Sequence, residues 1–336
     1  MSTAQPGARQ RFPGLDAAAL QHPYDRAALG ALQKVPGLDI VVRKFIELLP
    51  ERVAYIQNVS QTVRVTPHQC AHLYARLQEA CAILDVQEPE LYAAQYPVPN
   101  AYTSGHDHPY IVVTTGLLDL LNEDETMAVI AHELGHIKSG HVLYKTMARG
   151  IGFLVTLVGD MTLGVGRIIG RSLEAALLEW DRKSEFTADR AALLAVQNPR
   201  TMLSLMMKLA GGTLFQRDEM NASEFLNQAN LYEEVDANLL DRLYKYMMVT
   251  PLNHPLTIVR AREIMNWSEG TEYSNILAGR YPRTPSYSQG SESANGNGTT
   301  RRATNGSTGG TVIYCPHCGH AQANRRFCSL CGSSLL

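Results

Sequence analysis

The chain has no long uninterrupted apolar run and no excess of one charge. Its 336 residues carry a net charge of −2, so there is no broad basic surface of the kind that binds nucleic acid. No stretch reaches the roughly 20 uninterrupted apolar residues that span a bilayer. Residues 1–26 lack the apolar core of a secretory signal peptide. We therefore expect a cytoplasmic protein that binds no nucleic acid.

One apolar segment has two alternative interpretations, packing against another helix or contact with a membrane surface. Residues 151–170, IGFLVTLVGDMTLGVGRIIG, are apolar but are interrupted by Asp160 and Arg167. Charged residues inside a membrane span are expensive, which argues against a transmembrane helix. We expect its glycines to pack against another helix. A helical hairpin lying on a membrane surface, with peripheral attachment, is the alternative.

Cysteine is scarce except at the C-terminal end. Four of the six cysteines form two C-x-x-C pairs separated by nine residues, Cys315 with Cys318 and Cys328 with Cys331. Paired thiolates in tight turns are typical of a zinc ribbon, in which four ligands hold one structural zinc ion. Two disulfides in a secreted tail are the alternative, which the missing secretion signal disfavours. A ribbon of this kind could also bind a protein partner.

Composition divides the chain into four parts. Residues 1–23 are rich in Ala, Gln, Pro and Gly and are predicted to be a flexible arm. Residues 24–269 carry helical patterns, a β-branched segment at Tyr110–Thr115 and enough apolar content for a core. Residues 270–313 include a low-complexity run of Ser, Gly, Asn and Thr, which predicts a flexible linker. Residues 314–336 would form the ribbon.

The motif H-E-x-x-H occurs once, as His132, Glu133 and His136. Asn122 and Glu125 match a capping box, and an apolar period of 3.6 follows them, so the motif should lie inside a well-started helix. Two histidines four residues apart share one helix face and can bind one metal ion. Glu133 can act as the general base on a metal-bound water. His141, five residues past His136 and about 140° further round that helix, is predicted to have a structural role.

A catalytic zinc ion needs a third protein ligand. The segment EWDRKSEFTADRAALLA supplies Glu185 and, four residues later, Asp189 on the same helix face. Its alanines and leucines predict a buried helix, and a buried carboxylate needs a partner. Glu185 is therefore the predicted third ligand. Asp189 is predicted to accept a hydrogen bond from a ligand imidazole.

The chain contains three separated motifs, in VVTTGLLDLLNEDETMAVIAHELGHIKSGH, SEFTADRAAL and NHPLTIVRAREI. Through these motifs it resembles the HtpX-like zinc metallopeptidases, which include the type I prenyl-protein (CAAX) proteases. The resemblance covers roughly residues 100–267 and implies an α+β, mainly helical zincin-type (gluzincin) fold with a small sheet. It implies that Glu185 is the third ligand and Asp189 the companion acid. It also implies that Asn100 touches substrate. His254 and Arg260 match its H-P-x-x-x-x-R motif, where the histidine either caps the zinc or stabilises the oxyanion.

Together these patterns predict a zinc endopeptidase that cleaves damaged or unfolded protein, with one catalytic and one structural zinc ion. The strand near Tyr110 and Val112 is expected to be the edge strand that holds the substrate extended. A non-proteolytic chaperone or adaptor, binding a partner through the ribbon, is the alternative. Two departures separate the chain from the membrane-bound members of the family. It has no clear membrane helix before His132, and it carries the C-terminal cysteines.

Overall fold

The computed structural model describes residues 9–35, 38, 42, 45–46, 51–105, 108–148, 150, 152, 165–213, 219–234, 257–284, 312–314 and 321–323. These residues are mainly helical, with one four-stranded sheet, as the sequence predicts. The helices are the 3₁₀ turn η1 (Ala17–Ala19), α1 (Pro23–Leu32), α3 (Glu51–Gln61), α4 (Ala71–Leu84), α5 (Thr115–Leu120), α6 (Glu123–Lys138), α8 (Val165–Val196), α9 (Pro199–Gly211), α10 (Ala222–Glu234), α12 (Thr257–Glu269) and α13 (Thr271–Leu277).

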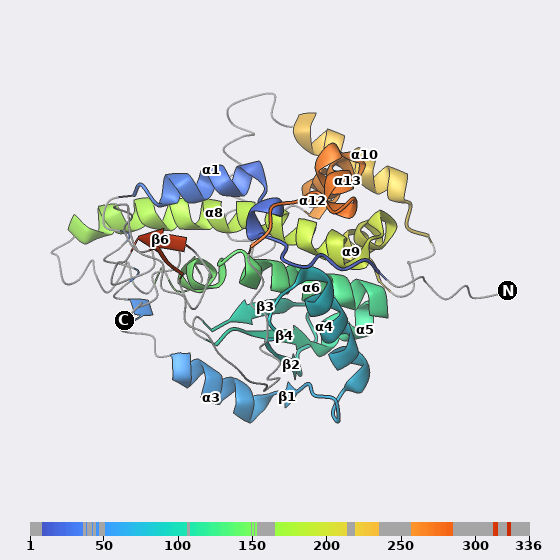
Figure 1. Ribbon diagram of the computed structural model, residues 1–336, viewed down its shortest axis with the longest axis horizontal. Helices are drawn as coiled ribbons and strands as arrows, with labels where there is room; N and C mark the ends of the chain where they lie inside the picture. The colour runs from blue at the N-terminus through green and yellow to red at the C-terminus, as the bar shows by residue number, and fades with distance from the viewer. Residues whose placement is uncertain are drawn as a thin grey trace, which may run out of the picture.

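The sheet has the strand order β1-β2-β4-β3, with β1 at Val63–Arg64, β2 at Glu90–Ala94, β3 at Ala101–Ser104 and β4 at Tyr110–Thr114. β2 and β4 are parallel, and the two outer strands are antiparallel to their neighbours. A separate hairpin pairs β5 (Val312–Tyr314) with β6 (Ala321–Ala323). β4 is thus an inner strand, and β3 is the edge strand next to α6 (Figure 1).

Alternation along the strands gives the sheet two different faces. Leu91, Ile111 and Val113 face α4 and α6 in the main core. Tyr92 and Tyr110 lie on the other face, where Tyr55 of α3 packs against them. The sheet is therefore covered on both sides, and α6 lies between it and the pair formed by α1 and α8 (Figure 1).

α6 begins where the sequence predicts. The Asn122 side chain accepts from the main-chain N–H of Glu125, and the Glu125 carboxylate accepts from the N–H of Asn122, so the capping box is complete. The buried side chain of Glu125 also forms an ion pair with Lys208 of α9, 2.6 Å apart. This start sets the direction in which His132 and His136 leave the helix.

α6 and α8 pack unusually close together at one glycine. A Cβ atom placed on Gly135 would lie 2.7 Å from the Cβ of Ala191 and 3.0 Å from the Cα of Ala188. Both alanines belong to the small-residue face of α8 and are fully buried. A glycine against two alanines lets the two helix backbones approach more closely than larger side chains would allow.

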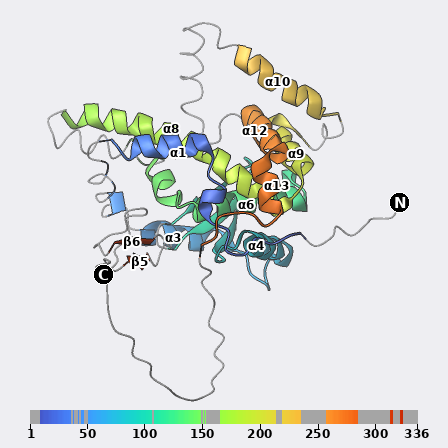
Figure 2. The same cartoon turned by 45° about the horizontal axis from the view of Figure 1, so that its top comes forward.

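A second core lies at the far end of α8. Leu32 of α1, Leu143 and Met147 of the helical segment 142–148, and Leu177 and Trp180 of α8 are all buried there. α1 and α8 run side by side in both views (Figures 1 and 2). The segment around His141 therefore lies between this core and the main one.

Two predicted boundaries are wrong. Residues 9–22, expected in a flexible arm, are packed: Phe12, Leu15 and Leu20 are buried in the main core. These three apolar residues, spaced among polar ones, outweigh the composition of the segment. Residues 270–284, expected in the linker, contain α13, whose Tyr273 and Ile276 are buried. Of the rest of the predicted linker, residues 285–311 lie outside the described residues and residues 312–313 belong to β5.

Among the described residues, no helix is long and apolar enough to cross a membrane. Most of the segment 151–170 lies outside them, so the alternative of a surface hairpin stays a prediction.

Candidate metal centre

Two helices bring three potential metal ligands together. His132 and His136 project from α6 and Glu185 projects from α8, and their ligand atoms all lie within 4.8 Å of one another. The Nε2 atom of His132 is 3.4 Å from Oε2 of Glu185, and that of His136 is 3.3 Å from Oε1. All three side chains are buried. This is the cluster that the sequence predicts.

The chemistry of the cluster fits a metal ion. Two imidazole nitrogens and one carboxylate form a donor set that zinc accepts in catalytic sites. The Nε2 atom of His136 is buried, and among the described residues it makes no hydrogen bond of good geometry, although Oε1 of Glu185 lies 3.3 Å away. A buried nitrogen in this position is rare unless it binds something else. Burial, assisted by the charge of Lys145, holds the pKa of His136 well below its usual value.

Charged groups lie behind His132. Its Nδ1 atom is 3.0 Å from Oδ1 of Asp189, and Arg260 binds both oxygens of Asp189 at 2.6 and 2.7 Å. Burial opposes the charge on each side chain. The nearby carboxylates of Glu185 and Asp189 nevertheless raise the pKa of His132 to about 9, and Arg260 lowers the pKa of Asp189. Asp189 thus contacts the ligand imidazole that the sequence assigns to it.

Arg260 lies among the carboxylates, where it is buried. Besides Asp189, its Nη1 atom is 3.2 Å from Oε2 of Glu185. The interactions that the structure gives for Arg260 therefore hold the acids of the site in place. A direct contact of Arg260 with substrate stays a prediction.

A histidine and an aspartate lie behind His136. The Nδ1 atoms of His136 and His141 are 3.1 Å apart, and Nε2 of His141 is 3.3 Å from Oδ2 of Asp25 in α1. The expectation that His141 lies about 140° round the helix is wrong, because α6 ends at Lys138. Gly140, with a φ of +68°, turns the chain back toward His136. Nothing in the sequence pattern points to Asp25, which reaches the site only through tertiary packing.

A buried lysine neutralises the third ligand. The Nζ atom of Lys145 lies 2.7 Å from Oε1 of Glu185 and 2.7 Å from Oδ1 of Asp181. Each oxygen of Glu185 therefore has one cation and one imidazole beside it: Lys145 with His136, and Arg260 with His132. Sequence reasoning missed Lys145, which sits on a short helical segment with no motif of its own.

Glu133 is oriented by the edge strand. Thr103 of β3 donates its hydroxyl hydrogen to Oε2 of Glu133 at 2.6 Å, and both residues are buried. Glu133 is adjacent to His132 but does not belong to the ligand cluster. This arrangement holds a carboxylate beside the cluster without making it a ligand, as a general base requires.

The expected substrate strand is corrected. Tyr110 and Val112 lie on β4, where they pair with Ser104 and Tyr102 of β3 on one side and with β2 on the other. Their main-chain groups are therefore already used within the sheet. A β-branched run indicates a strand but not its neighbours, so the sequence does not distinguish this inner strand from an edge strand. The main chain of Asn100 bonds to Thr114 at the start of β3, and a role for its side chain stays a prediction.

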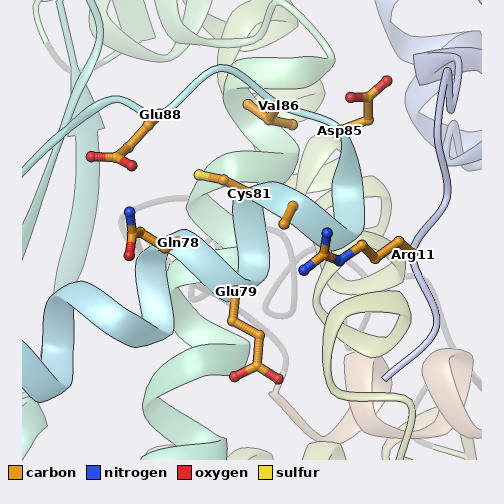
Figure 3. Close-up of a pocket in the computed structure, with 8 residues that line it drawn as sticks. Arg11, Gln78, Glu79, Cys81, Asp85, Val86 and Glu88 are labelled. Atoms are coloured by element: carbon orange, nitrogen blue, oxygen red, sulfur yellow. The ribbon is translucent and has the colours of Figure 1, made fainter. Parts of the chain in front are cut away.

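A surface hollow elsewhere has no share in this site. It lies beside α4 and is lined by side chains that include Arg11, Gln78, Cys81 and Glu88 (Figure 3). Its acids already have partners. Glu79 forms ion pairs with Arg9 and Arg76, and Asp85 accepts from the N–H of Gly14. Burial raises the pKa of Cys81 to about 12, so its thiol is not poised to react.

Five predicted site residues lie outside the described residues: His254 and the four ribbon cysteines, Cys315, Cys318, Cys328 and Cys331. The hairpin of β5 and β6 flanks the first C-x-x-C pair in the sequence. The roles of these residues stay predictions.

Comparison with known proteins agrees with the geometry of the cluster. The model of Peptidase family M48 matches residues 67–268. The chain is 39% identical over 269 residues to the plastoglobule-localized metallopeptidase 48 (chloroplastic) of Arabidopsis thaliana, with 79% of this chain and 77% of that protein covered. It is 29% identical over 169 residues to protease HtpX homolog 2 of Methanosarcina mazei, covering 44% of this chain and 58% of that protein.

A further relative is the protease HtpX homolog of Tropheryma whipplei, 31% identical over 147 residues, with 37% of this chain and 50% of that protein covered. The chain thus spans about half the length of these two HtpX homologues. No solved structure matches the chain. The family match spans α6, α8 and α12, which hold the candidate ligand cluster and its acids. The chain therefore belongs to Peptidase family M48, the HtpX-like metal-dependent proteases.

Proposed function

We propose that this chain is a zinc-dependent endopeptidase that hydrolyses peptide bonds in damaged or unfolded proteins, with Glu133 as the general base. The observation that carries the proposal is the meeting of three ligands, His132, His136 and Glu185, beside a carboxylate that is held but is not a ligand. Zinc bound there would supply a Lewis acid and a water molecule with a pKa near roughly 7.

The chain's own residues supply the proton transfer. Glu133 takes a proton from the attacking water and delivers it to the leaving amine nitrogen. Thr103 keeps that carboxylate in place with its hydroxyl hydrogen bond. The buried acids and cations around Glu185 hold the third ligand still, so the geometry needs little rearrangement during the reaction.

The edge strand favours an extended substrate. β3 pairs only with β4 among the described strands, so its outer edge offers main-chain groups to a further strand. An extended peptide binds such an edge through main-chain hydrogen bonds that do not depend on its sequence. Unfolded segments can adopt this conformation, whereas folded segments must first be released.

The test is digestion of an unfolded protein such as casein, with and without a chelator. Glu133→Gln keeps the shape of the side chain but cannot accept a proton. We expect it to retain zinc and to lose activity by on the order of 10³-fold or more. Glu123→Gln, an exposed position on the same helix, is the matched control and should keep activity. Near-normal cleavage by Glu133→Gln would rule the mechanism out.

The same assay addresses the alternative of a non-proteolytic chaperone or adaptor. Such a protein would suppress aggregation of an unfolded substrate without producing fragments. The pair formed by Glu133 and Thr103 favours the protease, because a scaffold has no use for a held carboxylate beside a metal cluster.

A second, structural zinc ion is proposed for the four C-terminal cysteines, Cys315, Cys318, Cys328 and Cys331. Two zinc ions per chain are then expected by elemental analysis. Ending the chain at residue 311 should remove one of them and leave the other. One zinc ion together with oxidised cysteines would contradict this assignment.

His254 is proposed to act at the same site, in one of two ways. If it caps the metal, His254→Ala should raise basal activity. If it stabilises the oxyanion, the same change should lower kcat by on the order of 10²-fold. Unchanged kcat would remove His254 from the site.

Contact with a lipid surface is proposed for residues 151–170, whose apolar, glycine-containing sequence suits a surface-lying hairpin. The relative from Arabidopsis thaliana bears the name plastoglobule-localized. Flotation with lipid vesicles should recover the full chain but not a variant with two aspartates placed in this segment.

A further inference from the structure

The nitrogen of His136 that faces away from the ligand cluster leads into a buried chain of polar groups. Nδ1 of His136 lies 3.1 Å from Nδ1 of His141, and Nε2 of His141 lies 3.3 Å from Oδ2 of Asp25. The three side chains are 0%, 2% and 0% exposed. Water therefore cannot replace a missing hydrogen bond, and the placement of each hydrogen matters.

The hydrogens at the Asp25 end are fixed by its neighbours. The indole Nε1–H of Trp180, which can only donate, points at Oδ1 from 3.0 Å. The hydroxyl of Thr187 accepts from the N–H of His22 and lies 2.6 Å from Oδ2, so its own hydrogen is directed to Asp25. Asp25 is therefore surrounded by donors and acts as an acceptor toward all of them.

This acceptor sets the direction of the next two bonds. His141 donates its Nε2 hydrogen to Asp25, which leaves a lone pair on its Nδ1 atom. His136 can then donate its own Nδ1 hydrogen to that lone pair, and its Nε2 atom is left bare toward Glu185. If the order were reversed, His136 would carry its hydrogen on Nε2 and could not bind a metal through it.

We propose that Asp25 is a positioning residue for the metal centre: through His141 it fixes the tautomer of His136 and so sets how tightly the site binds zinc. The proposal rests on the proposed function only in taking His136 as a ligand. Asp25 lies on α1, outside the residues 67–268 that the family model matches. Helix α1 then contributes a positioning residue to the metal centre as well as packing against α8.

The test is zinc affinity of the full chain, measured by competition with a chromophoric chelator. Two zinc ions are proposed for the chain, so the zinc-binding event that is absent in His136→Ala is assigned to this site. Asp25→Asn has the same shape but offers an amide N–H toward His141, which favours the reversed hydrogen order. We expect its zinc affinity to fall by about 10- to 100-fold, the usual effect of losing such a partner.

Further variants separate positioning from packing. Thr187→Val removes a partner of Asp25 but keeps the carboxylate beside His141, so its zinc affinity should stay within about threefold of the wild type. Since Asp25 acts through His141, the double change Asp25→Asn with His141→Leu should bind zinc no more weakly than His141→Leu alone. If Asp25→Asn does not fold, His141→Gln carries the test. Its amide oxygen can accept from His136, so it should bind zinc more tightly than His141→Leu.

The outcomes are distinguishable. Wild-type affinity in Asp25→Asn, while His136→Ala has lost the site, would overturn this inference and leave the proposed function standing. Additive losses in the double variant would also overturn it, because Asp25 would then act independently of His141. A wild-type chain that binds no zinc at His136 would overturn both.

Discussion

His132 and His136 leave the same helix one turn apart, yet their second nitrogens meet different groups. Behind His132 lies a charged pair, Asp189 clamped by Arg260. Behind His136 lies a second imidazole, His141, and only then a carboxylate, Asp25. The His132 side is stabilised by charge, and the His136 side depends on the direction of hydrogen bonds.

Glu185, the proposed third ligand, joins the two sides. Oε2 of Glu185 faces His132 and Arg260, and Oε1 faces His136 and Lys145. The difference between the sides predicts that changes behind His132 act mainly on stability. Changes behind His136 should act mainly on metal binding.

The largest effect is expected on the His132 side. Arg260→Met leaves Asp189 buried without its cation and takes one of the two cations from Glu185. Removing one partner of a buried ion pair destabilises by about 3–5 kcal/mol. Denaturant unfolding of the chelated protein measures this. Arg64→Met, which breaks an exposed pair with Glu90, is the control and should change the free energy of unfolding by less than about 1 kcal/mol. Equal losses in the two variants would contradict a charge-based role for Arg260.

Lys145→Met should have the next largest effect, about 2–3 kcal/mol in the chelated protein, because Glu185 loses one of its two cations. The loss should shrink when zinc is added, since a bound cation compensates the carboxylate. The control is Lys183→Met, whose pairing with Glu179 is partly exposed. A loss that zinc leaves unchanged would mean that Lys145 acts through packing alone.

Asp25→Asn should destabilise the chelated protein less than Arg260→Met does. It replaces an acceptor by an amide and leaves about one donor unsatisfied, a change of about 1–3 kcal/mol. Unfolding of the two variants under the same conditions gives the comparison. If Asp25→Asn were the more destabilising of the two, both sides of the site would depend on charge and the contrast would fail.

Counted per pH unit, the smallest change is expected with pH in the metal-free protein. The pKa of His132 is raised to about 9, so its contribution to stability is complete below its ordinary value near 6.5 and is lost as pH rises through about 9. The slope cannot exceed that of one proton, about 1.4 kcal/mol per pH unit. Urea unfolding between these pH values checks it, with His132→Gln as the reference. An identical slope in His132→Gln would assign the effect to another group.

The part of the site that follows helix periodicity could be predicted. His132, His136, Glu185 and Asp189 recur at four-residue spacing on two apolar helices, so their shared faces can be read directly. The capping box at Asn122 was confirmed for the same reason, since it is a local feature. These features can be predicted from local patterns because the residues involved are close together in the sequence.

The rest depends on contacts between distant segments. Asp25 reaches His141 because α1 packs along α8, and Thr103 reaches Glu133 because β3 lies at the edge beside α6. Neither contact can be predicted from residue spacing or composition. The error over Tyr110 and Val112 has the same origin, because a strand's own residues do not say which strands flank it.

Gly135 occupies the second unspecified position of H-E-x-x-H, and its contact with α8 gives that position a structural role. Ligands from two helices meet a metal correctly only if the helix axes stand at the right distance, and metal–ligand distances tolerate errors of about 0.2 Å. A methyl group at Gly135 would meet Ala191 at 2.7 Å, about 1 Å closer than carbon atoms prefer. Gly135 therefore sets the distance between α6 and α8, and with it the distance from Glu185 to the two histidines.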